Sequence, residues 1–222
     1  MTGRGLVSPE LRSRVRLLAD PIARGFGRLG LTPNALTIIG FGIAVLAAIA
    51  CGLGAWLAGA LLVVGGGVFD LFDGALARAT GKASRLGAFM DSTFDRAGEA
   101  VVYLGIVYAC GAAAFAVGGL LAAAAMAAAF LVSYTRARSE SLGFTPGSGM
   151  AAVGVAPREV RIVILTAGLA LVHVGGGIHE LPGRDGRTPL AATLFLIAVL
   201  ASVTTIQRIL HVMSQSREQE HV

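Results

Sequence analysis

The chain has 222 residues, of which 55% are hydrophobic and 14% are charged, and its mean hydropathy is +0.75. This composition excludes an ordinary soluble domain of this length and indicates that lipid is the solvent for most of the chain. The formal net charge of +5 is more simply explained by arginines that fix membrane topology than by nucleic acid, so no nucleic-acid partner is expected. No stretch outside the apolar segments is long enough for a separate core, which predicts one domain over residues 1–222.

The N-terminal segment alternates arginines with apolar residues from about residue 9 to residue 29. This pattern is typical of an amphipathic helix on a membrane surface, and a solvated helix on the protein itself explains it equally well. No apolar core of signal-peptide type precedes it, so a cleaved leader is not expected. Pro33 and Asn34 then provide helix-start signals before the first long apolar run.

Six segments are apolar over lengths near the roughly 20 residues that a bilayer requires. They cover about residues 34–53, 55–78, 86–110, 115–135, 160–174 and 189–209. The sequence therefore predicts an all-α membrane protein, with six transmembrane helices within about residues 34–212 and a juxtamembrane helix before them on the cytoplasmic surface.

The arginines and lysines indicate the orientation of these spans. With six spans both termini lie on one side, and all but two of the 18 basic residues then fall on that side. The exceptions are Arg184 and Arg187. Because basic residues gather on the cytoplasmic side, we expect a multi-pass protein of the plasma or inner membrane with both termini in the cytoplasm.

Four aspartates interrupt the ends of the second and third apolar runs, namely Asp70, Asp73, Asp91 and Asp95. A carboxylate deep in a span costs roughly 2.5 to 3.5 kcal/mol, so four uncompensated ones would cost about 10 to 14 kcal/mol. Helical spacing puts the first two on one face of their helix and the last two on one face of the next. Such a set requires a cationic partner.

Small residues accompany the acids at Gly74, Ala77 and Gly87. In membrane proteins small residues let two helix backbones approach closely, so we expect the two acidic helices to pack on each other and their carboxylates to converge. A site of carboxylates alone suits Mg²⁺ or Mn²⁺, with water or phosphate oxygens completing the coordination, whereas Zn²⁺ favours His or Cys.

Residues 70–95 read DLFDGALARATGKASRLGAFMDSTFD. They match the signature D-x2-D-G-x2-A-R-x8-G-x3-D-x3-D at every fixed position, so the chain resembles the CDP-alcohol phosphotransferase family. The resemblance implies attack of an acceptor hydroxyl on the β-phosphorus of a CDP-linked donor, usually CDP-diacylglycerol, with release of CMP. It also implies that Asp70, Asp73 and Asp91 are metal ligands, and that Asp95 is both a ligand and the general base.

The resemblance extends to the nucleotide. Gly74, Arg78 and Ser84, together with the first two aspartates, correspond to positions that hold the CDP donor. Thr32, Pro33, Asn34 and Ala35 resemble the loop that caps the nucleotide. Simple helix capping is an alternative for Ser84 and for this loop. Glu99, one turn after the last aspartate, is expected to pair with a cationic neighbour rather than to bind metal.

Three later stretches, at residues 133–143, 157–161 and 202–212, resemble the subfamily that makes phosphatidylinositol phosphate. There inositol phosphate is the acceptor, and its phosphate is received by basic residues that match Arg136, Arg158 or Arg161, and Arg208. Topology alone would also place arginines at these helix ends. Glycerol 3-phosphate, giving phosphatidylglycerol phosphate, is the alternative acceptor. The resemblance further implies a homodimer.

A different class of function is an ion or proton transporter, in which intramembrane aspartates form a pathway. A carrier explains the acids. It has no need of Gly74, Arg78 and Gly87 at these intervals, nor of acids gathered at one membrane face. A catalytically silent scaffold is hard to reconcile with an intact set of acids.

Overall fold

The computed structural model describes residues 21–23, 25–144, 150, 153–179, 183 and 185–220, and no strand occurs within them. The expected all-α class is therefore confirmed for this part of the chain. Most of the predicted juxtamembrane helix lies outside the described residues, although residues 21–23 and 25–28 are helical.

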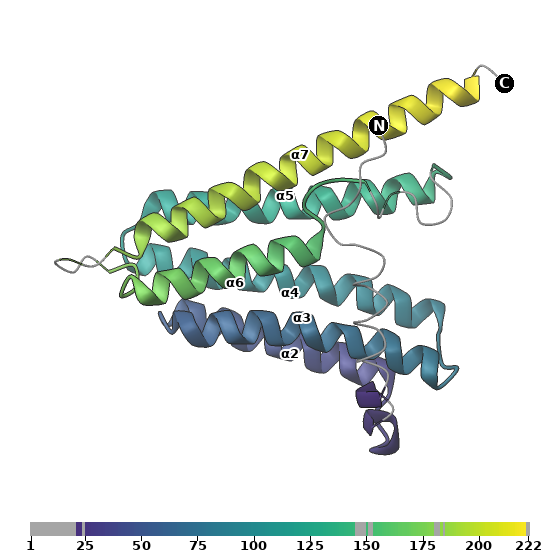
Figure 1. Ribbon diagram of the computed structural model, residues 1–222, viewed down its shortest axis with the longest axis horizontal. Coiled ribbons are helices and arrows are strands. Elements are labelled where there is room, and N and C mark those ends of the chain that lie inside the picture. The colour runs from purple at the N-terminus through teal and green to yellow at the C-terminus, as the bar shows by residue number, and fades with distance from the viewer. Residues whose placement is uncertain are drawn as a thin grey trace.

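Each of the six apolar segments forms a helix (Figure 1). The helices are α2 (Pro33–Gly52), α3 (Trp56–Ala79), α4 (Arg85–Ala112), α5 (Ala116–Ser141), α6 (Arg158–Val174) and α7 (Arg187–Glu220). The last one continues well beyond the predicted end at residue 209, because the polar sequence that follows still contains helix-forming residues.

Four of the described helices, α2, α3, α5 and α7, are long and apolar enough to cross a membrane, so the protein is a multi-pass membrane protein. Helix α4 has 28 residues, but three charged residues from Asp95 to Glu99 lower its hydropathy. Helix α6 has 17 residues, a rise of about 25 Å against a hydrocarbon core of about 30 Å. Helix α4 is less apolar than a typical membrane span and α6 is shorter than one, and both helices carry predicted site residues. Six membrane crossings therefore stay a prediction.

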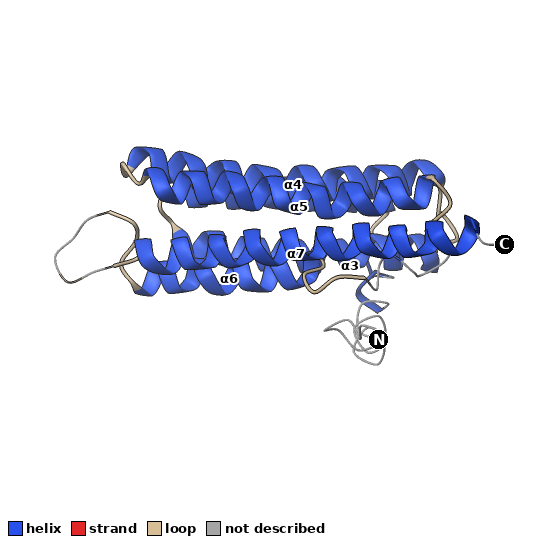
Figure 2. Ribbon diagram, turned by 90° about the horizontal axis from the view of Figure 1, so that it is seen from above, coloured by secondary structure: helices blue, strands red, loops and turns tan. Residues whose placement is uncertain are grey.

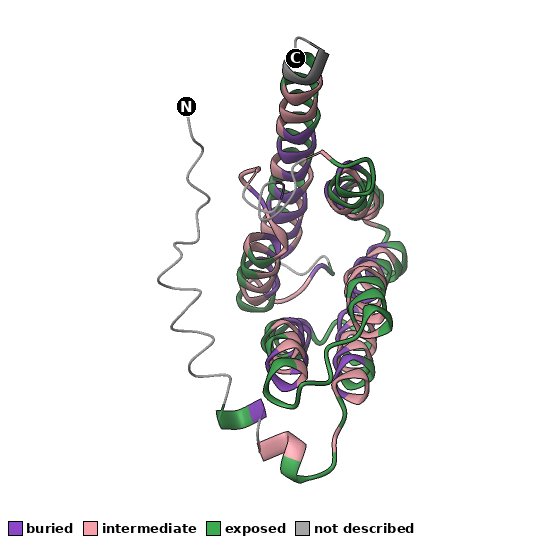
Figure 3. Cartoon of the chain, turned by 90° about the vertical axis from the view of Figure 1, so that its right-hand side faces the viewer, coloured by how far each residue is buried: buried purple, intermediate pink, exposed green. Residues whose placement is uncertain are grey.

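The helices form a ring in which each packs mainly on two others. The order around the ring is α3, α2, α4, α5, α7 and α6, which returns to α3. Short turns at residues 53–55 and 113–115 make α2 antiparallel to α3 and α4 antiparallel to α5. The helices consequently run side by side along the bundle (Figures 1 and 2), and Figure 3 shows them end-on.

The main apolar cluster draws buried side chains from all six helices, including Trp56, Tyr103 and Leu169. It occupies the half of the bundle that contains the two short turns. Large apolar side chains also cover the outside, as at Leu61 and Leu120, which are 62% and 73% exposed. A surface of this kind is suited to lipid, and the other half of the bundle is left to the charged residues.

Glycines on α4 fit this helix against α2. A Cβ atom at Gly98 would lie 3.1 Å from the Ala44 side chain, and one at Gly105 would collide with the backbone of Ala48. The expected direct packing of α3 on α4 is therefore wrong. Among the described residues, both acidic helices pack mainly on α2, which lies between them.

We expect Gly105→Ala to destabilise the bundle by about 1 to 3 kcal/mol, because the added methyl group must push α4 away from α2. Thermal unfolding in detergent measures this. The matched control is Gly111→Ala on the same helix, where a Cβ meets no atom within 4 Å, so stability should be unchanged or slightly raised. Equal unfolding temperatures for the two variants would contradict the packing described.

Candidate active site

The four aspartates lie in the half of the bundle opposite the short turns, on the last turns of α3 and the first turns of α4. Asp73 is 5% exposed, and the side chains of Asp70 and Asp95 are 18% and 15% exposed. Asp70 of α3 and Asp95 of α4 both lie within ion-pair distance of one arginine, Arg158. The two acidic helices therefore bring these two acids together, and a common site for all four aspartates stays a prediction.

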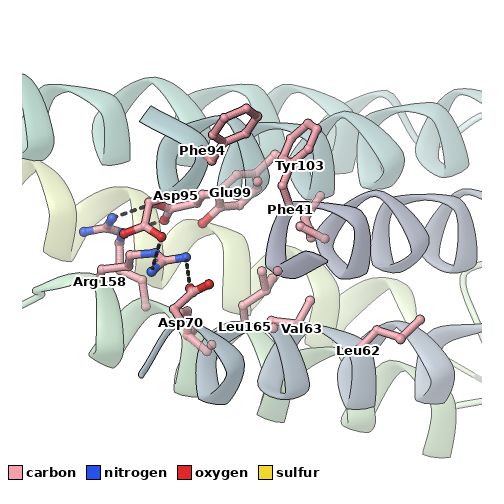
Figure 4. A pocket seen from close by; sticks show the side chains of 18 of the residues that line it. Phe41, Leu62, Val63, Asp70, Phe94, Asp95, Glu99, Tyr103, Arg158 and Leu165 are labelled. Carbon is pink, nitrogen blue, oxygen red and sulfur yellow. Dashed lines mark hydrogen bonds and ion pairs between the residues drawn. The ribbon is translucent and has the colours of Figure 1, made fainter. Parts of the chain in front are cut away.

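A guanidinium group lies between the two acidic helices. Arg158, the first residue of α6, places Nη2 2.7 Å from Asp70 Oδ2 and Nη1 3.0 Å from Asp95 Oδ1 (Figure 4). Its contact with Asp70 is an ion pair without hydrogen-bond alignment, since Asp70 Oδ2 is buried and accepts no hydrogen bond of good geometry. Arg158 thus bridges α3 and α4 from a third helix.

Asp73 is held differently. Its Oδ2 accepts a hydrogen bond of 2.8 Å from the Thr37 hydroxyl of α2, and its Oδ1 accepts one from the Gly74 amide. The two donors fix the plane of the carboxylate. Thr37 was not predicted as a site residue; the one available signal was a hydroxyl within an apolar run, one turn after Pro33.

The acids do not by themselves form a metal centre in this geometry, since no three His, Cys, Asp or Glu side chains of the described residues are grouped closely enough. Their chemistry nevertheless fits a hard divalent cation, because every candidate donor is a carboxylate oxygen. Asp70 Oδ2 has the Arg158 guanidinium as its partner and accepts no well-aligned hydrogen bond, so a metal cation would take the place of the guanidinium there.

The predicted nucleotide residues gather beside the acids. Thr32 caps α2 by accepting from the Ala35 amide at 3.2 Å, and Ser84 caps α4 by accepting from the Gly87 amide at 3.0 Å. A Cβ at Gly87 would contact both Ser84 Oγ and Asn34 Oδ1, so the starts of α2 and α4 adjoin. Thr32 and Ser84 therefore do cap these two helices, as the alternative interpretation of the sequence expected. Arg78 is exposed in the last turn of α3.

Two of the predicted phosphate-binding arginines are buried. Arg161 is 2% exposed and makes two hydrogen bonds of 2.8 Å to the carboxylate of Glu99, and a third of 3.0 Å to the Ala156 carbonyl. The prediction that Glu99 pairs with a cation is confirmed. This engagement disfavours Arg161 as a phosphate ligand, because three of its donors are already used inside the protein.

Arg208 is 4% exposed and donates to the backbone carbonyls of Val153, at 3.1 Å, and Val132. No carboxylate of the described residues lies within ion-pair distance of it, while Arg136 and Arg161 act on it as like charges and Glu140 acts on it as an opposite charge. Arg136 is exposed and pairs with Glu140 at 2.9 Å.

A pocket opens between α2, α3, α4 and α6, and Asp70, Asp95 and Arg158 lie in its wall (Figure 4). One end is charged and the other is apolar. Its charged and polar lining comprises Thr37, Asp70, Asp95, Glu99, Tyr103, Arg158 and Arg161. The apolar end includes Ala44, Leu62 and Leu165. An amphiphilic ligand fits such a lining better than a fully water-soluble one.

Residues 30–215 match the CDP-alcohol phosphatidyltransferase family. Archaetidylinositol phosphate synthase of Pyrococcus horikoshii is 34% identical over 204 residues, which cover 90% of this chain and 93% of that protein. Phosphatidylinositol phosphate synthase of Mycobacteroides abscessus is 31% identical over 217 residues, covering 92% of this chain and 86% of that protein. The chain belongs to the CDP-alcohol phosphatidyltransferase family.

Solved structures agree with this assignment. The crystal structure of Mycobacterium tuberculosis phosphatidylinositol phosphate synthase with CDP-DAG bound has a TM-score of 0.74 at 29% identity, and covers 87% of this chain and 92% of that chain. The complex of the same enzyme with manganese and citrate has a TM-score of 0.73 at 30% identity, covering 88% of each chain. This CDP-alcohol phosphatidyltransferase is therefore a membrane enzyme of phospholipid biosynthesis.

Removing one partner of the buried ion pair should be costly. Arg161→Met leaves the Glu99 carboxylate uncompensated, and we expect a loss of about 3 to 5 kcal/mol. Arg136→Met, which breaks an exposed pair, should cost about 0 to 1 kcal/mol. Unfolding of both variants in detergent measures the difference. Adding Glu99→Gln to Arg161→Met should recover part of the loss, and a double variant as unstable as the single one would contradict the assigned pairing.

Proposed function

We propose that this enzyme transfers the phosphatidyl group of CDP-diacylglycerol to a hydroxyl of inositol phosphate, giving phosphatidylinositol phosphate and CMP. The observation that carries the proposal is that Asp70 of α3 and Asp95 of α4 meet at one guanidinium group, that of Arg158. Arg208, which is buried with no carboxylate of the described residues within ion-pair distance, supports a phosphorylated acceptor. The relatives are named for archaetidyl and phosphatidyl products alike, and both names contain inositol phosphate. The names therefore support inositol phosphate as the acceptor more strongly than they support diacylglycerol as the lipid of the donor.

The four aspartates would hold Mg²⁺ or Mn²⁺, and the structure of a mycobacterial relative in complex with manganese supports a metal of this kind. Arg158 now bridges Asp70 and Asp95, and we infer that metal binding releases it from them. Charge supports this exchange, because a divalent cation neutralises more of a cluster of four carboxylates than one guanidinium does. A bound cation would neutralise the diphosphate and polarise the phosphorus under attack.

The donor would lie with its nucleotide at the charged end of the pocket and its lipid toward the apolar lining. Gly74 has no side chain, so the diphosphate of the donor would be able to approach its backbone closely. The guanidinium group of Arg78 would bind a phosphate through two hydrogen bonds. The caps formed by Thr32 to Ala35 and by Ser84 adjoin one another, which suits two edges of one nucleotide site.

Asp95 would act as the general base. The acceptor oxygen attacks the β-phosphorus, the bond from that phosphorus to the CMP oxygen breaks, and the hydroxyl proton passes to the Asp95 carboxylate. Arg158 contacts this carboxylate at 3.0 Å in the present structure. Its release would free Asp95 to accept a proton.

Arg208 supports a phosphorylated acceptor. A buried guanidinium that is hydrogen-bonded only to carbonyls, with no carboxylate of the described residues within ion-pair distance, is costly unless an anion completes it. We assign the acceptor phosphate to Arg208, Arg136 and the released Arg158, with Arg161 as a supporting residue. Cytoplasmic termini, location in the plasma or inner membrane, contact with membrane lipids and a homodimer stay predictions.

Purified enzyme given labelled CDP-diacylglycerol tests the acceptor. We expect lipid product and CMP with inositol phosphate, little product with glycerol 3-phosphate, and loss of both with EDTA because the donor phosphates then lack their cation. Reversed preference would make glycerol 3-phosphate the acceptor. Metal-independent ion flux in proteoliposomes without CMP release would favour the transporter instead.

Asp95→Asn should lower kcat by about 10²- to 10⁴-fold, since it removes the base while keeping the shape of the side chain. CDP-diacylglycerol binding should remain measurable by calorimetry. Asp70→Asn should instead raise the metal concentration that gives half-maximal rate, because it removes a ligand. Near-normal turnover of Asp95→Asn would assign the base to another group.

A further inference from the structure

Helix α2 carries no acidic residue, yet it adjoins two of the four site aspartates. Thr37 donates its hydroxyl hydrogen to Asp73 at 2.8 Å, and this contact is buried. Three residues further along, a Cβ at Gly40 would lie 2.9 Å from Asp70 Oδ1. Thr37 therefore holds Asp73 by a hydrogen bond, and the missing side chain of Gly40 leaves space for Asp70.

The antiparallel hairpin of α2 and α3 explains why these contacts come in step. Thr37 and Gly40 are three residues apart, as are Asp73 and Asp70, so a register that pairs one couple also pairs the other. The same register recurs near the turn, where a Cβ at Gly59 would lie 2.5 Å from Cys51 Sγ. The interaction of Thr37 with Asp73 is thus set by the packing of two whole helices.

We infer that Thr37 is a positioning residue that orients Asp73 for metal binding, an inference that rests on the proposed metal site. Carboxylates that bind metals are themselves held by hydrogen bonds from residues around them. Thr37 and the Gly74 amide each use one acceptor position on a different oxygen of Asp73. A carboxylate has about four such positions, so the remaining lone pairs stay available for a cation.

A purely local role for the Thr37 hydroxyl is the competing explanation, because its oxygen also lies 3.2 Å from the Pro33 carbonyl. A hydroxyl has only one hydrogen to donate. The carboxylate is nearer and charged, and hydrogen bonds to charged acceptors are roughly twice as strong as neutral ones. The bond to Asp73 is therefore the main one.

The test compares Thr37→Val, Thr37→Ser and the control Thr166→Val, all as full-length protein in detergent. The first variant replaces the hydroxyl by a methyl group of similar size, and the second keeps the hydroxyl. Thr166 lies on α6, and its buried hydroxyl has no hydrogen-bond partner. Mn²⁺ binding is measured by electron paramagnetic resonance, and CMP release is measured against Mn²⁺ concentration.

We expect Thr37→Val to weaken Mn²⁺ binding by about 10- to 100-fold, with much of the lost rate restored by excess Mn²⁺. Thr37→Ser should bind Mn²⁺ nearly as the wild type does, and Thr166→Val should be unchanged. Excess metal would not repair a merely structural defect. If Thr37→Val does not fold, Thr37→Ala, which is smaller and also lacks the hydroxyl, should show the same weakened binding.

Wild-type Mn²⁺ affinity in a folded Thr37→Val or Thr37→Ala protein would overturn the inference. So would a loss of rate at unchanged Mn²⁺ affinity. Wild-type protein that binds Mn²⁺ without using inositol phosphate would refute the proposed acceptor and leave the role of Thr37 supported by the binding data. A wild-type protein that binds no Mn²⁺ would refute both.

Discussion

Buried negative charge is the constraint on which this structure depends. Four aspartates and Glu99 lie in a protein whose surroundings are mostly apolar, and their charge must be compensated by neighbours. Helix α6 supplies two guanidinium groups three residues apart, with Arg158 toward Asp70 and Asp95 and Arg161 toward Glu99. The shortest helix of the ring is thus the one that joins α3 and α4 electrostatically.

The two arginines differ in how firmly they are held. Arg161 is almost fully buried and bonded to two carboxylate oxygens and a carbonyl. Arg158 is partly exposed, and its Nε is buried without a hydrogen-bond partner. These contacts suit Arg161 to permanent compensation of the Glu99 charge. They suit Arg158 to a contact that can be exchanged. A single face of α6 therefore combines a fixed support, Arg161, with the group that we propose changes partners, Arg158.

The sequence predicted what depends on local pattern. Apolar runs of adequate length predicted each helix, and helical spacing predicted that the aspartates share a site. Capping of α2 by Thr32 and of α4 by Ser84 followed from residue type, as did the pairing of Glu99 with a cation. What the sequence did not predict concerns contacts between distant segments. The place of α2 between the acidic helices depends on glycines of α4, and neither the bridge by Arg158 nor the bond from Thr37 has a signature in its own helix.

The tight turn at residues 53–55 has a consequence for the far end of the molecule. It joins α2 directly to α3, and Thr37 lies about 24 Å of helix away from it. One residue inserted into α2 between this turn and Thr37 would rotate Thr37 by about 100° and shift it by about 1.5 Å relative to α3. The length of helix between this turn and the site, which starts at the end of the bundle remote from the chemistry, is therefore constrained by the bond from Thr37 to Asp73.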